Sequence, residues 1–146
     1  MLEAGVDVGL GTDSVASNNR CDMIEEARFC GLIHRATSRD SSELTPERLL
    51  KLATLDGART LRLDREIGSL EVGKQADIVA IDLSGAHNTP IHDPVSAIIF
   101  SASADDVIFT AVAGRVLFDG ALQTLDESDL QQRVDEAMSR VLAKLS

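Results

Sequence analysis

Asp13 is the residue whose type and position in this sequence best fit catalytic chemistry. It follows a short apolar and β-branched segment, residues 6–10, which predicts a buried strand. Gly9 and Gly11 allow a second backbone or a ligand to approach this segment closely. A carboxylate at the carboxyl end of a buried strand, followed by a polar loop and a helix, stands where α/β barrels keep their catalytic groups. The residues alone leave a second interpretation open, in which Asp13 only caps a turn.

Four stretches of the sequence follow one another in an order that resembles a known family. The first is Gly-Leu-Gly-Thr-Asp-Ser-Val-Ala-Ser-Asn-Asn with Asp-Met-Ile-Glu-Glu-Ala-Arg soon after, and the second is Ile-Gly-Ser-Leu-Glu-Val-Gly-Lys-Gln-Ala-Asp-Ile-Val-Ala-Ile-Asp-Leu. The third is His-Asp-Pro-Val and the fourth is Thr-Ala-Val-Ala-Gly-Arg-Val. Together they are similar to the amidohydrolase superfamily, in its branch of chlorohydrolases and S-adenosylhomocysteine or methylthioadenosine deaminases. The first stretch resembles the last barrel strand, and the second resembles the return into the small β-domain. The four stretches occupy residues 9–28, 67–83, 92–95 and 110–116.

The resemblance implies a role for Asp13. In such enzymes this residue binds one divalent metal ion, zinc or iron, and takes a proton from the metal-bound water that attacks a C–N carbon. The implied substrate of the whole enzyme is a small molecule, a purine-like or other amino-heterocycle that is deaminated. Ser17, Asn18 and Asn19 border the pocket by the same resemblance, and they either contact the substrate or only shape the loop. Ser14 stands where many relatives have glycine, which leaves the subgroup open.

The family's other metal ligands and its acid–base glutamate are not found in this sequence. In relatives the His-x-His pair, two further metal histidines and the glutamate all precede the last barrel strand. His34, His87 and His92 have no ligand spacing, and Asp13 alone cannot supply the three or four protein ligands of a zinc site. We therefore expect the C-terminal third of a larger enzyme, which binds no metal by itself and is inactive alone. Two alternatives stay open: a stand-alone small α/β module that binds a partner or assembles with itself, and one half of a split enzyme.

The expected fold class is α/β, in two parts. Residues 1–66 are predicted to form the last strand and helices of a (β/α)8 barrel, and residues 67–146 the C-terminal part of a composite β-sandwich domain with a terminal helix. Without the other barrel strands, residues 6–10 and the first helix would expose apolar surface and unpaired strand edges. We expect the isolated chain to associate with itself, as a dimer, to cover this surface.

Helix signals mark the elements that follow Asp13. Asp22 with Glu25 three residues later has the spacing of a capping box and predicts a helix over residues 22–35. His34 on this helix is interpreted as a partly buried side chain with a hydrogen-bonded partner, because a lone helical histidine is a weak ligand signal. This first helix would be packed between two layers of the fold, since apolar residues lie on more than one of its sides.

Two more helices and several strands are predicted downstream. Thr45 as N-cap and Pro46 at the first helical position predict a helix that Gly57 ends or bends, with further helical turns over residues 58–63. Apolar residues spaced three and four apart predict a terminal helix over residues 127–145. Short apolar runs and a turn at Ala113-Gly114 predict strands over residues 78–81, 95–101, 107–112 and 115–118.

Several other polar or sulfur-containing residues are interpreted as structural. Lys74 and Asp77 are predicted to be surface turn residues, and Asp93, beside His92, is expected to cap and orient a turn between prolines. Met138 lies on the apolar stripe of the terminal helix and is expected to pack in the core.

Composition excludes some classes of partner and compartment. The chain has 146 residues, 44% of them hydrophobic, and a net charge of −10, which fits one globular domain but neither nucleic acid nor an anionic membrane as a partner. No apolar run approaches the ~18 residues of a membrane-spanning helix. Cys21 and Cys30 lie in or beside one predicted helix, which disfavours a disulfide between them, and free thiols predict a cytoplasmic protein.

Overall fold

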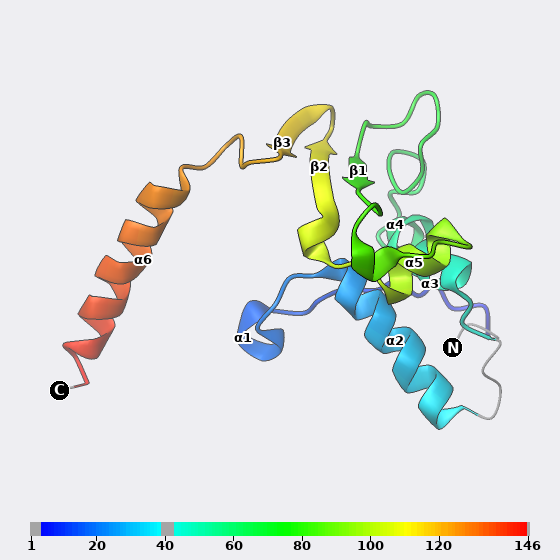
Figure 1. Ribbon diagram of the computed structural model, residues 1–146, viewed down its shortest axis with the longest axis horizontal. Helices are drawn as coiled ribbons and strands as arrows, with labels where there is room; N and C mark the ends of the chain where they lie inside the picture. Colours follow the sequence, from blue (N-terminus) through cyan, green and yellow to red (C-terminus); the bar gives the residue numbers. More distant parts are fainter. Residues whose placement is uncertain (1–3, 39–42, 146) are drawn as a thin grey trace.

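The computed structural model describes residues 4–38 and 43–145. Their fold is mixed α/β, as the sequence predicted, with a cluster of helices beside a small sheet and a terminal helix that stands apart (Figure 1). Two short 3-10 turns, η2 and η3, connect parts of the second half of the chain. In chain order the elements are α1 (Val15–Asn18), α2 (Met23–Thr37), α3 (Pro46–Ala53), α4 (Leu55–Thr60), β1 (Ile78–Ile81), η2 (Ala86–Asn88), α5 (Pro94–Phe100), η3 (Ala104–Asp106), β2 (Val107–Val112), β3 (Arg115–Asp119) and α6 (Glu127–Leu142).

The core lies where α2, α3 and α5 meet. Its largest fully buried side chains are Leu49 of α3 and Ile99 of α5. Gly31 allows α2 to come close to α3, because a Cβ built at this position would lie 2.7 Å from a Leu49 methyl carbon. One core thus joins helices from both sides of position 66, the boundary predicted from the sequence. The buried core residues are Ala27, Leu44, Leu49, Leu52 and Ile99.

The predicted starts of α2 and α3 are confirmed. The Asp22 carboxylate accepts hydrogen bonds from the backbone N–H groups of Ile24 and Glu25, at 2.9 and 3.1 Å. The Thr45 hydroxyl oxygen accepts from the Arg48 N–H at 3.3 Å, and proline occupies the first helical position that follows. Side-chain acceptors of this kind satisfy the N–H groups that the first turn of a helix leaves unpaired.

The sheet has three antiparallel strands in the order β1-β2-β3. The hairpin between β2 and β3 turns at Ala113 and Gly114, which both have positive φ angles, 50° and 77°. Positive φ at both central residues is the geometry that matches the twist of a tight hairpin. The prediction of a β1 strand and of this hairpin is therefore confirmed.

Lys74 and Asp77 hold the segment that leads into the sheet. The Lys74 side chain is only 11% exposed, and its ammonium donates to the Asp64 carbonyl and to the Ser69 hydroxyl, both at 2.6 Å. The expectation of a surface residue is therefore wrong for Lys74, because its charge is satisfied by acceptors that the loop folds around it. Asp77 accepts from the Ala113 N–H at 2.7 Å and so ties the start of β1 to the hairpin turn.

The expectation that residues 6–10 form a strand is wrong for this chain. The segment has no regular secondary structure, although Val8 and Leu10 pack against the core. Its backbone makes one hydrogen bond outside the segment among the described residues, from the Leu10 N–H to the Leu52 carbonyl at 3.2 Å. A strand needs a neighbour for its ladder of hydrogen bonds, and the described residues supply none here.

Residues 95–101 were also expected to form a strand, and this expectation is wrong. They lie in helix α5 and at its C-cap, and Asp93 accepts a hydrogen bond from the Ser96 N–H at 2.6 Å. The predicted capping role of Asp93 is thus confirmed, but the cap belongs to a helix. A short apolar run does not distinguish a buried strand from a buried helical turn by periodicity.

The α3 helix ends earlier than expected. Thr54, with φ −126° and ψ −98°, separates α3 from α4, and Gly57 lies inside α4 instead of ending α3. Asp56 is buried between the two helices and is paired with Arg48 at 2.6 Å and with Arg59 at 2.8 Å. These ion pairs hold the two short helices as one unit.

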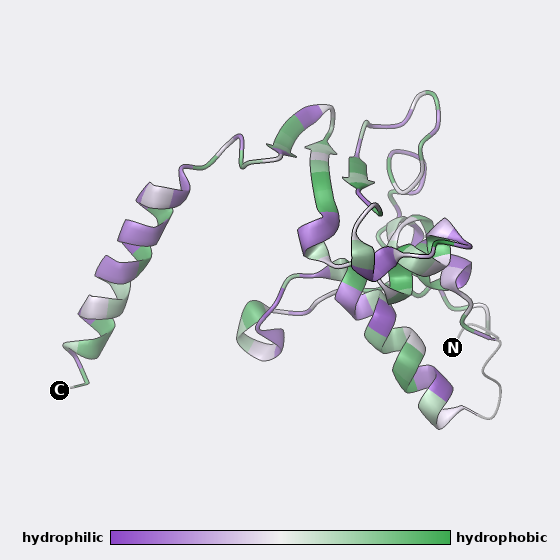
Figure 2. Ribbon diagram, viewed as in Figure 1, coloured by the Kyte–Doolittle hydropathy of each residue, from purple (hydrophilic) through white to green (hydrophobic). Residues whose placement is uncertain are grey.

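The terminal helix α6 forms as predicted, but its apolar side chains are not buried. Figure 1 shows α6 separated from the rest of the fold by an extended linker, and Figure 2 shows its apolar stripe uncovered. Met138 is 56% exposed, so the expectation that it packs in the core is wrong. Among the described residues, no helix is both long and apolar enough to cross a membrane.

Candidate functional site

Asp13 lies in an exposed loop between residues 6–10 and α1. Its backbone has φ 58°, in the left-handed region that short polar residues tolerate better than others. The Thr12 hydroxyl donates to the Asp13 carbonyl at 3.2 Å, so the contact fixes the backbone and leaves the carboxylate open. Within the described part of the chain no donor is paired with this carboxylate, which is therefore available to a ligand.

Asn18 fastens the Asp13 loop from the other side. Its side-chain amide donates to the Thr12 carbonyl at 2.8 Å and also to the Glu26 carboxylate on α2. Asn19 has φ 66° and ends α1, while Ser17 is exposed. For Asn18 the structure thus supplies the loop-shaping role that the sequence left as one of two interpretations. Contact of Ser17, Asn18 and Asn19 with a substrate stays a prediction.

The histidines do not gather around Asp13. His34 is 29% exposed, so it is partly buried as predicted, and its Nε2 lies 2.9 Å from a Glu43 carboxylate oxygen. The expected hydrogen bond is not formed, because this nitrogen has no hydrogen-bond partner among the described residues. His87 lies 3.0 Å from Asp106 in another part of the fold. His92 is exposed in the turn before α5.

A metal centre complete in itself does not fit these residues. Within residues 4–38 and 43–145, no group of three or more histidine, cysteine, aspartate or glutamate side chains could hold a metal ion. A zinc site needs three or four protein ligands. Asp13 therefore has the chemistry and the exposure of one ligand, and any further ligands must come from outside the described residues.

Asp22 connects the Asp13 loop to the second half of the chain. It is 7% exposed, and besides capping α2 it accepts a hydrogen bond from the Ala104 N–H at 3.3 Å. Arg28, in the second turn of α2, donates from Nε to the Ile99 carbonyl at 3.1 Å and also to the Ala102 carbonyl. The capping spacing revealed the first role of Asp22, but no sequence signal pointed to these contacts across the chain.

Two titratable groups near the core have shifted pKa values. A hydrogen bond from His87 and one from the Ser103 backbone N–H lower the pKa of the Asp106 carboxyl below its ordinary value. Burial, and then the nearby Glu26 charge, raise the pKa of the Cys30 thiol. Cys30 is therefore held as a thiol, which is a poor nucleophile and metal ligand.

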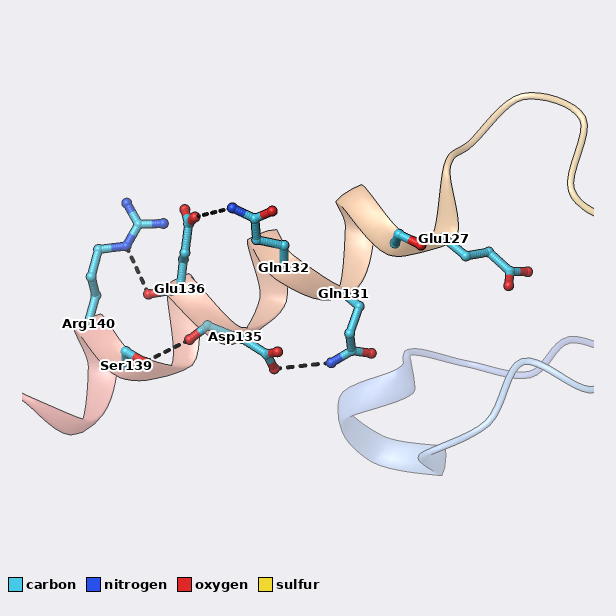
Figure 3. Close-up of a pocket in the computed structure, with 8 residues that line it drawn as sticks. Glu127, Gln131, Gln132, Asp135, Glu136, Ser139 and Arg140 are labelled. Atoms are coloured by element: carbon cyan, nitrogen blue, oxygen red, sulfur yellow. Dashed lines mark hydrogen bonds between the residues drawn. The ribbon is translucent and has the colours of Figure 1, made fainter.

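The concave surfaces of the molecule differ in character. A hollow along α6 is lined by polar side chains that hydrogen-bond within the helix, such as Gln131 to Asp135 at 3.0 Å and Gln132 to Glu136 at 3.1 Å (Figure 3). It is a solvated face of an exposed helix. A second groove of about 800 Å³ is mainly apolar and runs beside Gly9 and Leu10, against α3, α4 and β1.

Comparison with known proteins places these features in a family. Residues 1–117 match the amidohydrolase family. The chain is 38% identical over 97% of its length to a 5-methylthioadenosine/S-adenosylhomocysteine deaminase of Acetivibrio thermocellus, and 40% identical over 100% of its length to an S-triazine hydrolase of Gordonia rubripertincta. It spans about a third of these relatives, 33% of the first and 31% of the second.

Solved structures agree with the sequence relatives. A zinc-bound adenosine deaminase from Xanthomonas campestris is 35% identical and superposes over 97% of this chain and 33% of its own, with a TM-score of 0.92. A zinc complex of atrazine chlorohydrolase from Arthrobacter aurescens is 30% identical over 94% of this chain and 30% of its own, with a TM-score of 0.81. The expected membership is confirmed: the chain belongs to the amidohydrolase family.

Proposed function

We propose that this chain is the C-terminal part of a metal-dependent hydrolase that acts on C–N bonds other than peptide bonds, and that it is inactive alone. The supporting observation is that the chain matches the family but lacks a full set of metal ligands among its described residues. The chain matches the family along residues 1–117 and carries Asp13 in an exposed loop, while its described residues offer no set of metal ligands. On this proposal, the remaining metal ligands come from barrel strands outside this chain.

Asp13 is the group that this chain contributes to the reaction. Its carboxylate would supply one ligand to a divalent metal ion, zinc or iron, whose other ligands would come from the rest of the barrel, and the metal would lower the pKa of the attacking water. The same carboxylate takes a proton from the attacking water and passes it to the leaving group, which a carboxylate can do when it lies within hydrogen-bond reach. The unpaired, solvent-facing state of Asp13 supports this role.

The proposed substrate is an amino-substituted nitrogen heterocycle that is deaminated by water. Relatives of this chain include deaminases of methylthioadenosine and of 5'-deoxyadenosine and a hydrolase of s-triazines. Their common chemistry is attack of water on a ring carbon that bears an exocyclic leaving group. Ser17 of α1 and Asn19 at its C-cap follow the Asp13 loop, and this proposal puts them at the border of the substrate pocket, with Asn18 between them in sequence.

A chimeric enzyme tests this function. The C-terminal third of the Acetivibrio thermocellus deaminase is replaced by this chain, which matches 97% of its own length there, and ammonia release from methylthioadenosine is measured with zinc present. We expect activity from the chimera, a loss of about 10²–10⁴-fold in its Asp13→Asn variant, and no turnover by the isolated chain. A folded but inactive chimera would contradict the proposal, as would turnover and tightly bound zinc in the isolated chain. If adding the deaminase's first two thirds as a separate polypeptide also restores activity, the chain can work as half of a split enzyme.

We also propose that the isolated chain forms a dimer with a second copy of itself. The supporting observation is apolar surface that the described residues leave uncovered on α2 and α6, including Phe29 at 49%, Ile33 at 60% and Val141 at 54% exposure. Soluble monomeric proteins rarely leave large apolar patches open to water. A stand-alone, self-assembling module without catalysis would need the same surface. Sedimentation at micromolar concentration tests the dimer, and a monomer there would contradict it.

The proposed compartment is the cytoplasm. Cys21 and Cys30 are both free thiols in the structure. Free thiols persist in reducing compartments, whereas oxidising ones favour disulfides. Labelling of both thiols in freshly lysed cells, before any reductant is added, tests this assignment.

A further inference from the structure

The segment that leads to Asp13 touches α4 backbone to backbone. A Cβ built on Gly9 would lie 2.7 Å from the Gly57 Cα and 3.4 Å from the Gly57 nitrogen. Interiors are packed too tightly to absorb a contact of that length without moving the backbone. By contrast, a Cβ built on Gly11, two residues further on, would meet nothing within 4 Å. The glycine at position 9 is therefore required by the approach of α4, and the one at position 11 is not.

A hydrogen bond from the next residue, Leu10, stabilises the same contact. The Leu10 N–H donates to the Leu52 carbonyl at 3.2 Å. This carbonyl lies near the end of α3, which stops just before Thr54. The last turn of a helix leaves backbone carbonyl groups without partners inside the helix, so they can accept other hydrogen bonds. A Cβ built on Gly57 would lie 3.3 Å from that same Leu52 oxygen. Gly57 thus leaves room both for the Gly9 backbone and for the acceptor that binds Leu10.

The junction between α3 and α4 is rigid enough to serve as a support. The buried Asp56 is paired with Arg48 of α3 and with Arg59 of α4. The Thr60 hydroxyl donates to the Asp56 carbonyl at 2.9 Å, which adds a hydrogen bond inside α4 to these ion pairs. The loop that carries Asp13 is therefore held at two places. One is this junction, and the other is the Thr12 carbonyl, to which the Asn18 side chain donates a hydrogen bond.

We propose that Gly9 and Gly57 are positioning residues for Asp13, and that their close contact sets where its carboxylate stands in the assembled site. The inference rests on the proposed function of Asp13. Gly9 lies four positions before Asp13. Among the described residues, the hydrogen bond of Leu10 is the last backbone hydrogen bond to α3 or α4 before the exposed loop. A shift of Gly9 is thus passed on to Asp13, whereas the residues themselves touch neither substrate nor metal.

Two glycine variants test this inference in the chimeric deaminase described above. In Gly9→Ala the new methyl group collides with Gly57, and we expect kcat to fall about 10–100-fold, the range for a displacement of about 1 Å in an active site. In Gly57→Ala the neighbour has to give only a few tenths of an ångström, and we expect a fall of about 3–10-fold with no loss of melting temperature, since alanine is the better helix former. KM should stay within about twofold in both variants, because ground-state binding of the substrate does not depend on the placed carboxylate. Gly11→Ala is the matched control in the isolated chain, where a Cβ at this position meets nothing within 4 Å.

Hydrogen exchange of the Leu10 amide in the isolated chain gives a second readout that needs no catalysis. Exchange should be faster in Gly57→Ala than in the unmodified chain, and unchanged in Gly11→Ala. If the unmodified chimera is inactive, the proposed function fails, and the exchange result alone decides the role of the glycines. If Gly57→Ala keeps both kcat and Leu10 protection, or if Gly11→Ala loses as much Leu10 protection as Gly57→Ala, the positioning role is wrong. Should Gly9→Ala fail to fold, Gly57→Ala still decides.

Discussion

The helical body formed by α2, α3 and α5 and the terminal helix α6 start from similar local signals and end in opposite environments. Asp22 caps α2 through two backbone N–H groups, and Asp126 caps α6 in the same way, at 2.8 and 3.2 Å. Both regions carry apolar side chains at helical spacing. Yet Leu49 in the body is fully buried, whereas Val134 on α6 is 50% exposed.

This difference shows that a helix signal and a burial signal are separate. Capping and periodicity decide whether a segment coils, and they act within a few residues. Burial needs a second surface, and within the described residues α6 has none. An isolated helix of about this length is marginal in water, so α6 is only weakly stable without a surface to pack against. The body, by contrast, carries its own core.

The largest expected difference between the two regions comes from truncating an apolar side chain. Leu49→Ala should lower the free energy of unfolding by about 2–5 kcal/mol, because it empties part of a closed core. Val134→Ala on α6 should change it by less than about 0.5 kcal/mol in the monomer, because the side chain is already in water. Urea denaturation of both variants at low protein concentration measures the two effects. Equal losses would show that α6 shares the core in solution.

A charged residue gives the next largest contrast. Asp56→Asn should cost about 1.5–3 kcal/mol, because a buried carboxylate bonded to Arg48 and Arg59 is replaced by a neutral amide. The matched change is Asp129→Asn on α6, whose exposed pair with Arg133 at 3.6 Å is of the kind worth about 0.2–1 kcal/mol. Chemical denaturation in low and high salt separates them, since only the exposed pair is strongly screened. A loss at Asp56 no larger than at Asp129 would mean that α3 and α4 are not locked together.

The two aspartate caps sharpen the comparison further. Asp22→Ala should lower the free energy of unfolding by about 0.5–2 kcal/mol, the usual cost of losing an N-cap, and the lost contact with Ala104 should place it near the upper end. Asp126→Ala should fray α6 and reduce helicity without moving the main unfolding transition. Circular dichroism at 222 nm during thermal unfolding detects both results. A shifted main transition in Asp126→Ala would contradict the independence of α6.

The smallest expected effect is a pH dependence of the body. The hydrogen bond from His87 and then that from the Ser103 N–H lower the pKa of Asp106 in the folded chain. A carboxyl with a depressed folded pKa contributes stability that is present above its unfolded pKa and is lost as the pH falls through the folded pKa. Melting temperatures measured from pH 5 downward should therefore fall, and less steeply in Asp106→Asn. An acid limb that is identical in the variant would exclude Asp106 as a contributor.

Local signals in the sequence predicted the elements whose conformation is decided within a few residues. The caps of α2 and α3, the hairpin at Ala113-Gly114 and the helix α6 are all of this kind. Residues 95–101 were assigned to the wrong element because a short apolar run is compatible with a strand and with a helix, and only packing against α2 and α3 distinguishes the two. The strand predicted over residues 6–10 does not form, because a segment without a neighbouring strand cannot make the ladder of hydrogen bonds that a strand needs.

For the site, the sequence by itself determined the family and pointed to Asp13, because ordered motifs of glycine, aspartate and asparagine survive without any knowledge of contacts. Only the tertiary structure decided how that residue is held. The hydrogen bonds of Asn18, the contact of Gly9 with Gly57 and the bond from Leu10 to Leu52 join residues that are up to 48 positions apart. Such contacts depend on how helices approach one another in space, and no local pattern of residues encodes that distance.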